Sequence, residues 1–175
     1  NFPISTFTGT IIVVCSRSEK IPFSNFQEMT SLGQMHLSYK VKKNFKDLNS
    51  DDYITIPFPE KMSAKEIIFF FTDANVAKSK HLELGSKISK LVTLKNSVLV
   101  CDQKILSLDF LTGLILPLYS FDKYKSFGTH QNYECSVLYK NSKSIIPLIS
   151  RAKAVCEGVF FARDLTNEPS NRLNT

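Results

Sequence analysis

The sequence has few of the residues that usually build metal centres. Its three histidines are His36, His81 and His130, and they fall on three separate predicted elements. None of them belongs to an HExxH motif or to a CxxC…H spacing. We therefore interpret each histidine as a surface or cap residue rather than as a metal ligand.

Cysteine is also scarce, with four residues and no CxxC pair. Cys15, Cys101 and Cys135 lie in apolar runs typical of strands, and Cys156 lies in a predicted helix. Cysteine packs as a small hydrophobe, so we expect reduced and mostly buried thiols in a cytoplasmic protein. A disulfide framework is the alternative interpretation.

The sequence lacks the usual phosphate-binding and membrane-spanning patterns. Its six glycines are dispersed, and neither GxxxxGK[ST] nor GxGxxG occurs. No apolar run reaches the roughly 18–20 residues that a membrane span needs. The start, Asn1-Phe2-Pro3, shows neither the basic nor the apolar region of a secretory signal. We expect a cytoplasmic protein with no membrane partner.

What is present is ordinary globular composition over 175 residues, with 43% hydrophobic and 22% charged residues. This length is sufficient for one domain with a sizeable core. The formal net charge is +6, which permits binding to phosphates or acidic partners. However, the lysines are spread along the chain, and a scattered basic surface usually serves solubility alone.

Short apolar runs alternate with stretches of helical spacing. Strands are predicted at Thr8–Ser16, Asp52–Phe58, Lys65–Thr72, Ser97–Cys101 and Tyr133–Tyr139. Helices are predicted at Ile21–Phe45, at Lys78–Leu94 and at Gln103–Ser120, the third bent near Pro117. A last helix is predicted from about Ser144 to Thr166, with Pro147 in its first turn. This order predicts an α/β fold with a mixed, mostly parallel sheet. The Asp52–Thr72 pair of strands is close enough in sequence to include an antiparallel or edge arrangement.

The last helix carries one apolar face, which we expect to pack on the sheet. The face consists of Ile145, Ile149, Ala152, Cys156, Val159 and Phe160. The helix must end before Pro169, because a residue that precedes proline is pushed out of the α region. We expect the segment Asn167–Thr175 to be loosely held and to lead into a further domain.

Two segments carry a resemblance to a known family. Ala162-Arg163-Asp164-Leu165, followed by Asn167, Pro169 and Asn171, is similar to the A-R-D-L-x-N-x-P-x-N segment of the cytosol (leucyl) aminopeptidase family. Upstream, Leu118–Lys125 is similar to the family's Y-x-F-D-x-Y-K segment. The order of elements also agrees, from about Gly9 to Thr175.

The resemblance implies the architecture and the domain organisation. The family's N-terminal domain is a sheet sandwiched by helices, similar to a macro domain. Residues 1–142 would form this non-catalytic α/β domain, and residues 143–175 would form the linker helix and the start of the catalytic domain. The resemblance places Arg163, Asp164, Asn167, Pro169 and Asn171 at the domain junction. It assigns no catalytic or metal-binding residue to this sequence.

The resemblance also implies what the whole protein does. Members are metallo-aminopeptidases that release N-terminal residues from peptides, act as homohexamers and use two divalent metal ions, zinc or manganese. Their N-T-D-A-E-G-R signature, which supplies metal ligands and the catalytic arginine, is absent from this sequence. We therefore expect this part to bind no cofactor and to serve oligomerisation and domain positioning beside the catalytic domain of the same chain.

Two binding functions remain as alternatives. Some family members bind DNA through this region, and Lys40, Lys42, Lys43 and Lys46 form the densest basic cluster. A macro-like module could instead bind a nucleotide such as ADP-ribose, on the strength of the fold alone. In many relatives a glycine-containing turn follows the strand that matches Ile67–Thr72, whereas here the turn is Thr72-Asp73-Ala74-Asn75.

Overall fold

The computed structural model describes residues 6–16, 49–59, 62–73, 75–92, 96–101, 104–124, 134–138 and 142–169. Its strands are β1 (Thr10–Ser16), β2 (Tyr53–Pro57), β3 (Glu66–Thr72), β4 (Ser97–Val100) and β5 (Cys135–Leu138). Its helices are the 3-10 turn η4 (Lys78–Lys80), α2 (His81–Ser89), α3 (Leu108–Ile115), the 3-10 turn η5 (Leu116–Leu118) and α4 (Ser142–Asn167).

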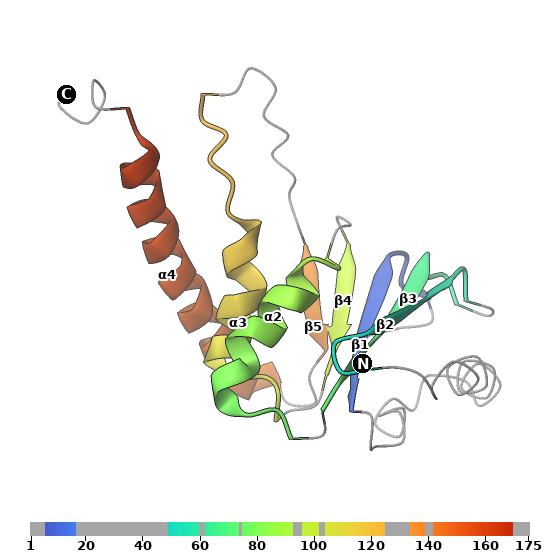
Figure 1. Ribbon diagram of the computed structural model, residues 1–175. Coiled ribbons are helices and arrows are strands. Elements are labelled where there is room, and N and C mark those ends of the chain that lie inside the picture. Colours follow the sequence, from blue (N-terminus) through green and yellow to red (C-terminus); the bar gives the residue numbers. More distant parts are fainter. Residues whose placement is uncertain are drawn as a thin grey trace.

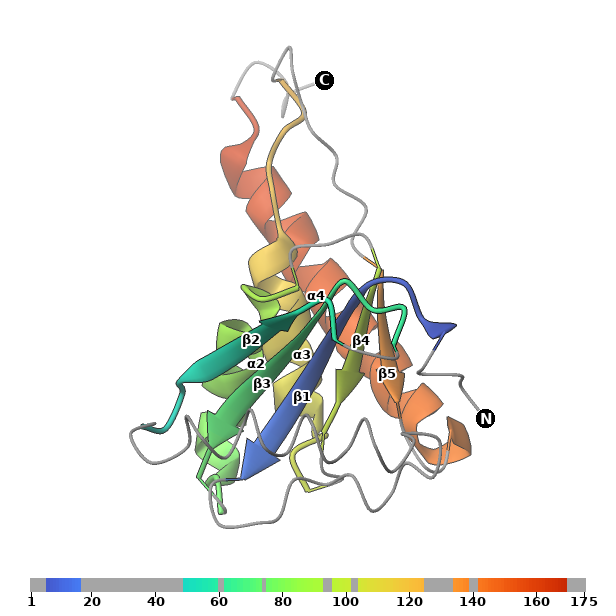
Figure 2. The ribbon, with the colours of Figure 1, turned by 90° about the vertical axis from the view of Figure 1, so that its right-hand side faces the viewer.

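The five strands form one sheet in the order β2-β3-β1-β4-β5. β1 pairs in parallel with β3 and with β4, and β4 pairs in parallel with β5. β2 lies at the edge and runs antiparallel to β3, as Figure 2 shows. The predicted mixed, mostly parallel sheet is therefore confirmed, and so is the antiparallel edge arrangement of the Asp52–Thr72 pair.

Both faces of the sheet are apolar, because the central strands place large side chains on alternate sides. On one face Ile12, Ile68 and Leu99 pack against α2 and α3. On the other face Ile11 and Phe69 belong to a second buried cluster. The described helices α2, α3 and α4 all lie on the first face (Figure 1). The predicted helix Ile21–Phe45 lies outside the described residues.

α2 and α3 cross at two glycines. A methyl group on Gly85 would lie 2.2 Å from the Phe110 carbonyl oxygen, and one on Gly113 would lie 2.1 Å from the Leu82 carbonyl oxygen. Only residues without a side chain permit this approach. The crossing places the start of α3 beside α2, where Ser107 caps α3 by accepting a 3.2 Å hydrogen bond from the Phe110 amide.

The predicted helix Gln103–Ser120 is too long at both ends. Its α-helical part is α3, which begins after the Ser107 cap, and the chain tightens into η5 around Pro117. The cap explains the late start, since Ser107 is extended and cannot continue a helix. Likewise, the predicted helix Lys78–Leu94 consists of the η4 turn followed by α2, and its predicted end is too late, because α2 ends at Ser89.

The last helix differs from the prediction in two ways. α4 begins at Ser142, so that Pro147 lies inside the helix rather than in its first turn. It packs mainly on α3, through Ile145, Ala152 and Cys156, and the Cys156 thiol points at the Thr112 carbonyl oxygen, 3.8 Å away. Its C-terminal half extends beyond the sheet (Figure 1). The prediction that the whole apolar face packs on the sheet is therefore wrong in its outer part.

No described helix is both long enough and apolar enough to span a bilayer.

Candidate functional site

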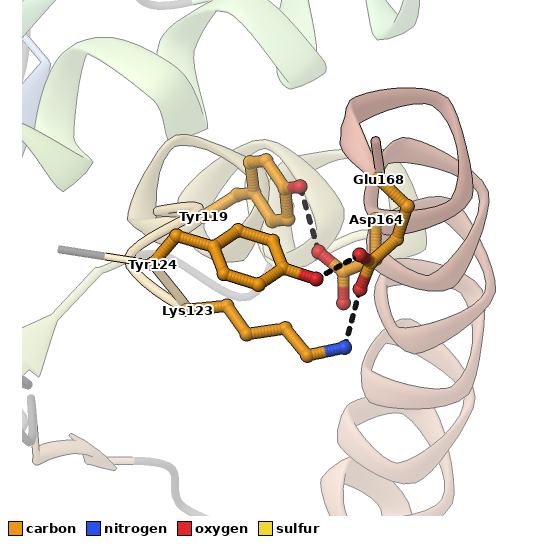
Figure 3. Close-up of polar contacts among 5 residues, drawn as sticks. All are labelled: Tyr119, Lys123, Tyr124, Asp164 and Glu168. Carbon is orange, nitrogen blue, oxygen red and sulfur yellow. Dashed lines mark hydrogen bonds and ion pairs between the residues drawn. The ribbon is translucent and has the colours of Figure 1, made fainter. Parts of the chain in front are cut away.

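The two segments that carry the family resemblance contact each other at the outer end of α4. Tyr119, Lys123 and Tyr124 follow η5, and they face the last turn of α4 in Figure 3. Their partners there are Asp164, Asn167 and Glu168. We call these six residues the junction cluster.

Tyr119 is the centre of the junction cluster. Its hydroxyl donates a 2.7 Å hydrogen bond to the Asp164 carboxylate and accepts one from the Asn167 side-chain amide at 3.2 Å. Desolvation and the hydrogen bond to Asp164 raise the pKa of Tyr119 above its ordinary value. The phenol therefore stays protonated at neutral pH and remains a donor.

Glu168 receives two donors from the segment after η5. The Lys123 ammonium forms an ion pair with one carboxylate oxygen, and the Tyr124 hydroxyl donates to the other. The Glu168 side chain is only 11% exposed, although Lys123 is mostly in solvent. The hydrogen bond to Glu168 raises the pKa of Lys123, so this amine is charged at neutral pH.

Apolar and cation–π contacts complete the packing around Tyr119. The Tyr119 and Phe160 rings lie 5.3 Å apart between centroids at a 34° tilt. The Arg163 guanidinium lies 5.4 Å from the centre of the Tyr119 ring, within cation–π range. Phe160 is half-buried through this contact rather than being part of the core.

The end of α4 is well defined. The Glu168 amide donates to the Asp164 carbonyl at 2.9 Å, and the helix stops one residue before it, at Asn167. Pro169 follows, so the expected stop before this proline is confirmed. The expectation of a loosely held segment from Asn167 is wrong as far as Glu168, because the junction cluster binds both residues.

The structure therefore brings together three of the five residues expected at the domain junction. Asp164 and Asn167 hydrogen-bond to Tyr119, and Arg163 lies against its ring. Pro169 is exposed beyond the cluster, and Asn171 lies outside the described residues. Glu168 was not expected, because it occupies a position that the A-R-D-L-x-N-x-P-x-N segment leaves open. The sequence signal for Glu168 was its position four residues after Asp164, which is about one helical turn.

The histidine and cysteine residues form no metal centre in the part of the chain that the structure describes. No group of three or more His, Cys, Asp or Glu side chains that could hold a metal occurs there. His81 is buried, and its Nδ1 shares a 2.8 Å hydrogen bond with the Ser107 hydroxyl. Of the two expected roles, surface or cap residue, the surface role is wrong and the cap role is confirmed, because His81 is the C-cap of η4. His36 and His130 lie outside the described residues.

All four cysteines are free, as expected. Cys15 and Cys156 are buried, whereas Cys101 and Cys135 are half-buried. Burial raises the pKa of the Cys15 thiol to about 12 and also raises the pKa values of Cys135 and Cys156. The thiols of Cys15, Cys135 and Cys156 are therefore poor nucleophiles, since the thiolate is the reactive form.

A cavity of about 220 Å³ lies at the carboxyl end of β3, the end at which α/β sheets commonly bind ligands. Its charged lining consists of Asp51, Asp73 and Glu83 against Lys80 and Lys87. Lys87 is held by Asp51 at 2.7 Å and by Glu83 at 2.6 Å. Thr72, Asp73 and Asn75 line this cavity, but the excess of carboxylates disfavours a phosphate ligand.

Comparison with known proteins shows which proteins the chain is similar to. It is 28% identical over 134 residues to a probable cytosol aminopeptidase of Dinoroseobacter shibae, covering 75% of this chain and 27% of that protein. It is 27% identical over 190 residues to the cytosol aminopeptidase of Rickettsia prowazekii, covering 95% of this chain and 37% of that protein. The chain is a relative of the cytosol aminopeptidases. No family model matches it.

The resemblance carried by the two segments is therefore confirmed, because the chain is similar to the cytosol aminopeptidases over part of their length, consistent with their N-terminal domain. It spans between about a quarter and two fifths of the length of these two relatives. Solved structures share its fold. A mutant of tomato leucine aminopeptidase matches 94% of this chain with a TM-score of 0.66 at 17% identity. The bottromycin maturation enzyme BotP in complex with Mn matches 94% with a TM-score of 0.61 at 12% identity. The match covers 36% and 33% of these two chains.

Proposed function

We propose that this chain is the non-catalytic part of a cytosol aminopeptidase that releases N-terminal residues from peptides. In this proposal residues 1–142 form a domain similar to a macro domain. Residues 143–175 form the linker helix and the beginning of the catalytic domain. The chain positions the catalytic domain and contributes to a homohexamer in the cytoplasm.

The junction cluster is the observation that supports this proposal. A helix that leads from one domain to another transmits orientation only if its outer end is held, because a free helix end frays. Here two hydrogen bonds to Tyr119 and two contacts to Glu168 hold that end. The direction in which the chain leaves the domain is thereby fixed.

The proposed chemistry belongs to the rest of the polypeptide. Two divalent ions, zinc or manganese, would bind there, activate a water molecule and polarise the peptide carbonyl. The described residues hold no cluster suited to two such ions. Asp51 is engaged by Lys87, and the Asp52 carboxylate accepts a 2.7 Å hydrogen bond from the Asn49 amide. This fits a role in support of catalysis.

The test uses the full-length protein with Tyr119→Phe, which removes both hydrogen bonds of the phenol and keeps the ring. We expect a lower kcat/KM for leucine p-nitroanilide, because the linker helix is no longer held. Tyr53→Phe is the matched control, since Tyr53 is an exposed edge-strand tyrosine outside the cluster. An unchanged kcat/KM in Tyr119→Phe would contradict the positioning role.

Binding of nucleic acid or of a nucleotide is the second candidate function. The net charge of +6 and the cavity at the end of β3 favour it, but the lining of that cavity is net acidic. Calorimetry with ADP-ribose tests the nucleotide. A DNA filter-binding titration tests the nucleic acid, where a slope of several units in log K against log salt marks phosphate contacts. We expect no measurable binding in either experiment.

A further inference from the structure

α4 carries a second apolar face, which nothing in the described chain covers. Positions that are three, four and seven residues apart lie on one side of a helix. One such set is formed by Ala154, Val155, Gly158, Phe161, Ala162 and Leu165. We call it the outer stripe, and it lies opposite the face that packs on α3. Phe161 is 65% exposed, Leu165 45% and Val155 44%.

The composition of the outer stripe indicates a contact surface. It contains no charged side chain, although charged residues lie on both sides of it along the helix. Gly158 lies at its centre, and a methyl group there would meet no atom within 4 Å apart from its chain neighbours and the backbone of its own helix. A glycine weakens a helix interior, and packing within the described chain gives no reason for it. A glycine at this position would let another backbone approach the helix closely.

We propose that the outer stripe is the surface on which the downstream part of the same polypeptide docks, through an apolar patch that fits between Phe161 and Leu165. This inference rests on the proposed function, in which the chain continues beyond Thr175. The relatives support it, because the chain spans only 27% and 37% of two of them. The junction cluster holds the opposite side of the same helix end, so the stripe faces a fixed direction.

The size of the outer stripe distinguishes a tethered partner from a free one. Residues 154–165 extend over roughly 18 Å of helix about 10 Å wide, or roughly 200 Å². A stable interface between separate proteins buries about 800 Å² on each partner. A second copy of this chain would thus be held weakly, whereas a covalent tether supplies a high effective concentration.

Thiol labelling tests the docking without relying on activity. Leu165→Cys introduces a thiol into the outer stripe, and Lys153→Cys introduces one on another exposed side of α4. Both variants are made in the 175-residue chain and in the full-length protein. Maleimide labelling at each site is followed by mass spectrometry, and circular dichroism checks that every variant is folded.

We expect the thiol from Leu165→Cys to react about tenfold or more slowly in the full-length protein than in the 175-residue chain. The thiol from Lys153→Cys should react at the same rate in both. Equal rates for Leu165→Cys would overturn the proposal. If the thiol from Leu165→Cys already reacts slowly in the 175-residue chain, and light scattering shows that this chain is a dimer, the proposal is overturned. The outer stripe would then bind a second copy of the chain. A full-length protein without peptidase activity would overturn the proposed function, while the labelling would still decide the docking.

Discussion

At the scale of single residues, Tyr119 connects the two segments that define the family resemblance. Its hydroxyl bonds to Asp164 and Asn167, and its ring contacts Phe160 and Arg163. One side chain therefore joins the segment after η5 to the last turns of α4. Lys123 and Tyr124 add a second attachment at Glu168.

The titration of Tyr119 gives the first prediction. Both Tyr119 and Lys123 have raised pKa values in the folded chain. A group with a raised folded pKa stabilises the fold below its unfolded pKa, and this contribution is lost as the pH rises through the folded pKa. In the unfolded chain, tyrosine and lysine have pKa values of about 10 and 10.4. The contacts of the junction cluster should therefore be intact at neutral pH and weaken only above about pH 10.

Ultraviolet absorbance of tyrosinate measures this directly. The chain has six tyrosines, and Tyr119→Phe should remove the component that ionises above the ordinary midpoint. Loss of a component at or below the ordinary midpoint would show that Asp164 does not accept the phenol hydrogen in solution.

Two adjacent phenylalanines give the second prediction. Phe160 is half-buried on Tyr119, so Phe160→Ala should lower the free energy of unfolding by roughly 1–2 kcal/mol, the scale of an aromatic pair with partial burial. Phe161 is 65% exposed, so Phe161→Ala in the 175-residue chain should change it by no more than about 0.5 kcal/mol. Urea unfolding measures both. A larger effect of Phe161→Ala would mean that the two faces of α4 are assigned the wrong way round.

At the scale of elements, the crossing of α2 and α3 sets the shape of the helical layer. Gly85 and Gly113 each lie against a backbone carbonyl of the other helix. Gly158 in α4 has no such neighbour. These glycines of the described helices therefore have different roles, although their local sequences alone do not distinguish them.

The third prediction compares these glycines. Gly85→Ala should destabilise the chain by about 1–3 kcal/mol, because the added methyl group forces the helices apart. Gly158→Ala should stabilise it by roughly 0.5–1 kcal/mol, because alanine is the better helix former. Thermal unfolding of the two variants compares them. Stabilisation by Gly85→Ala would contradict the tight crossing.

Much of this element-scale structure can be predicted from the sequence, and the limits have physical causes. The β-branched runs around Ile11 and Ile67 predict central strands, because only residues buried on both faces are apolar throughout. The extent of α3 was not predictable from its leucines, since the Ser107 cap and Pro117 decide where it begins and ends. The apolar positions of α4 predicted one face, but which neighbour covers it depends on contacts distant in sequence.

At the scale of the whole molecule, the candidate site was predictable only in part. The segments at Tyr119 and Asp164 each resemble the family, yet nothing local shows that they touch. Their contact follows from α3 and α4 lying side by side, so that η5 releases the chain next to the end of α4 (Figure 1). Glu168 completes the cluster from a position with no motif assigned to it. The resulting domain holds its outgoing helix at the outer end, and the proposed chemistry lies elsewhere in the polypeptide.

Peptidase assays on the 175-residue chain and on the full-length protein test this account most directly. Both are purified and assayed with leucine p-nitroanilide, with and without manganese. We expect metal-dependent turnover by the full-length protein and none by the 175-residue chain, because the proposed function places the two-metal chemistry in the rest of the polypeptide. Metal-dependent turnover that co-purifies with the 175-residue chain would contradict it.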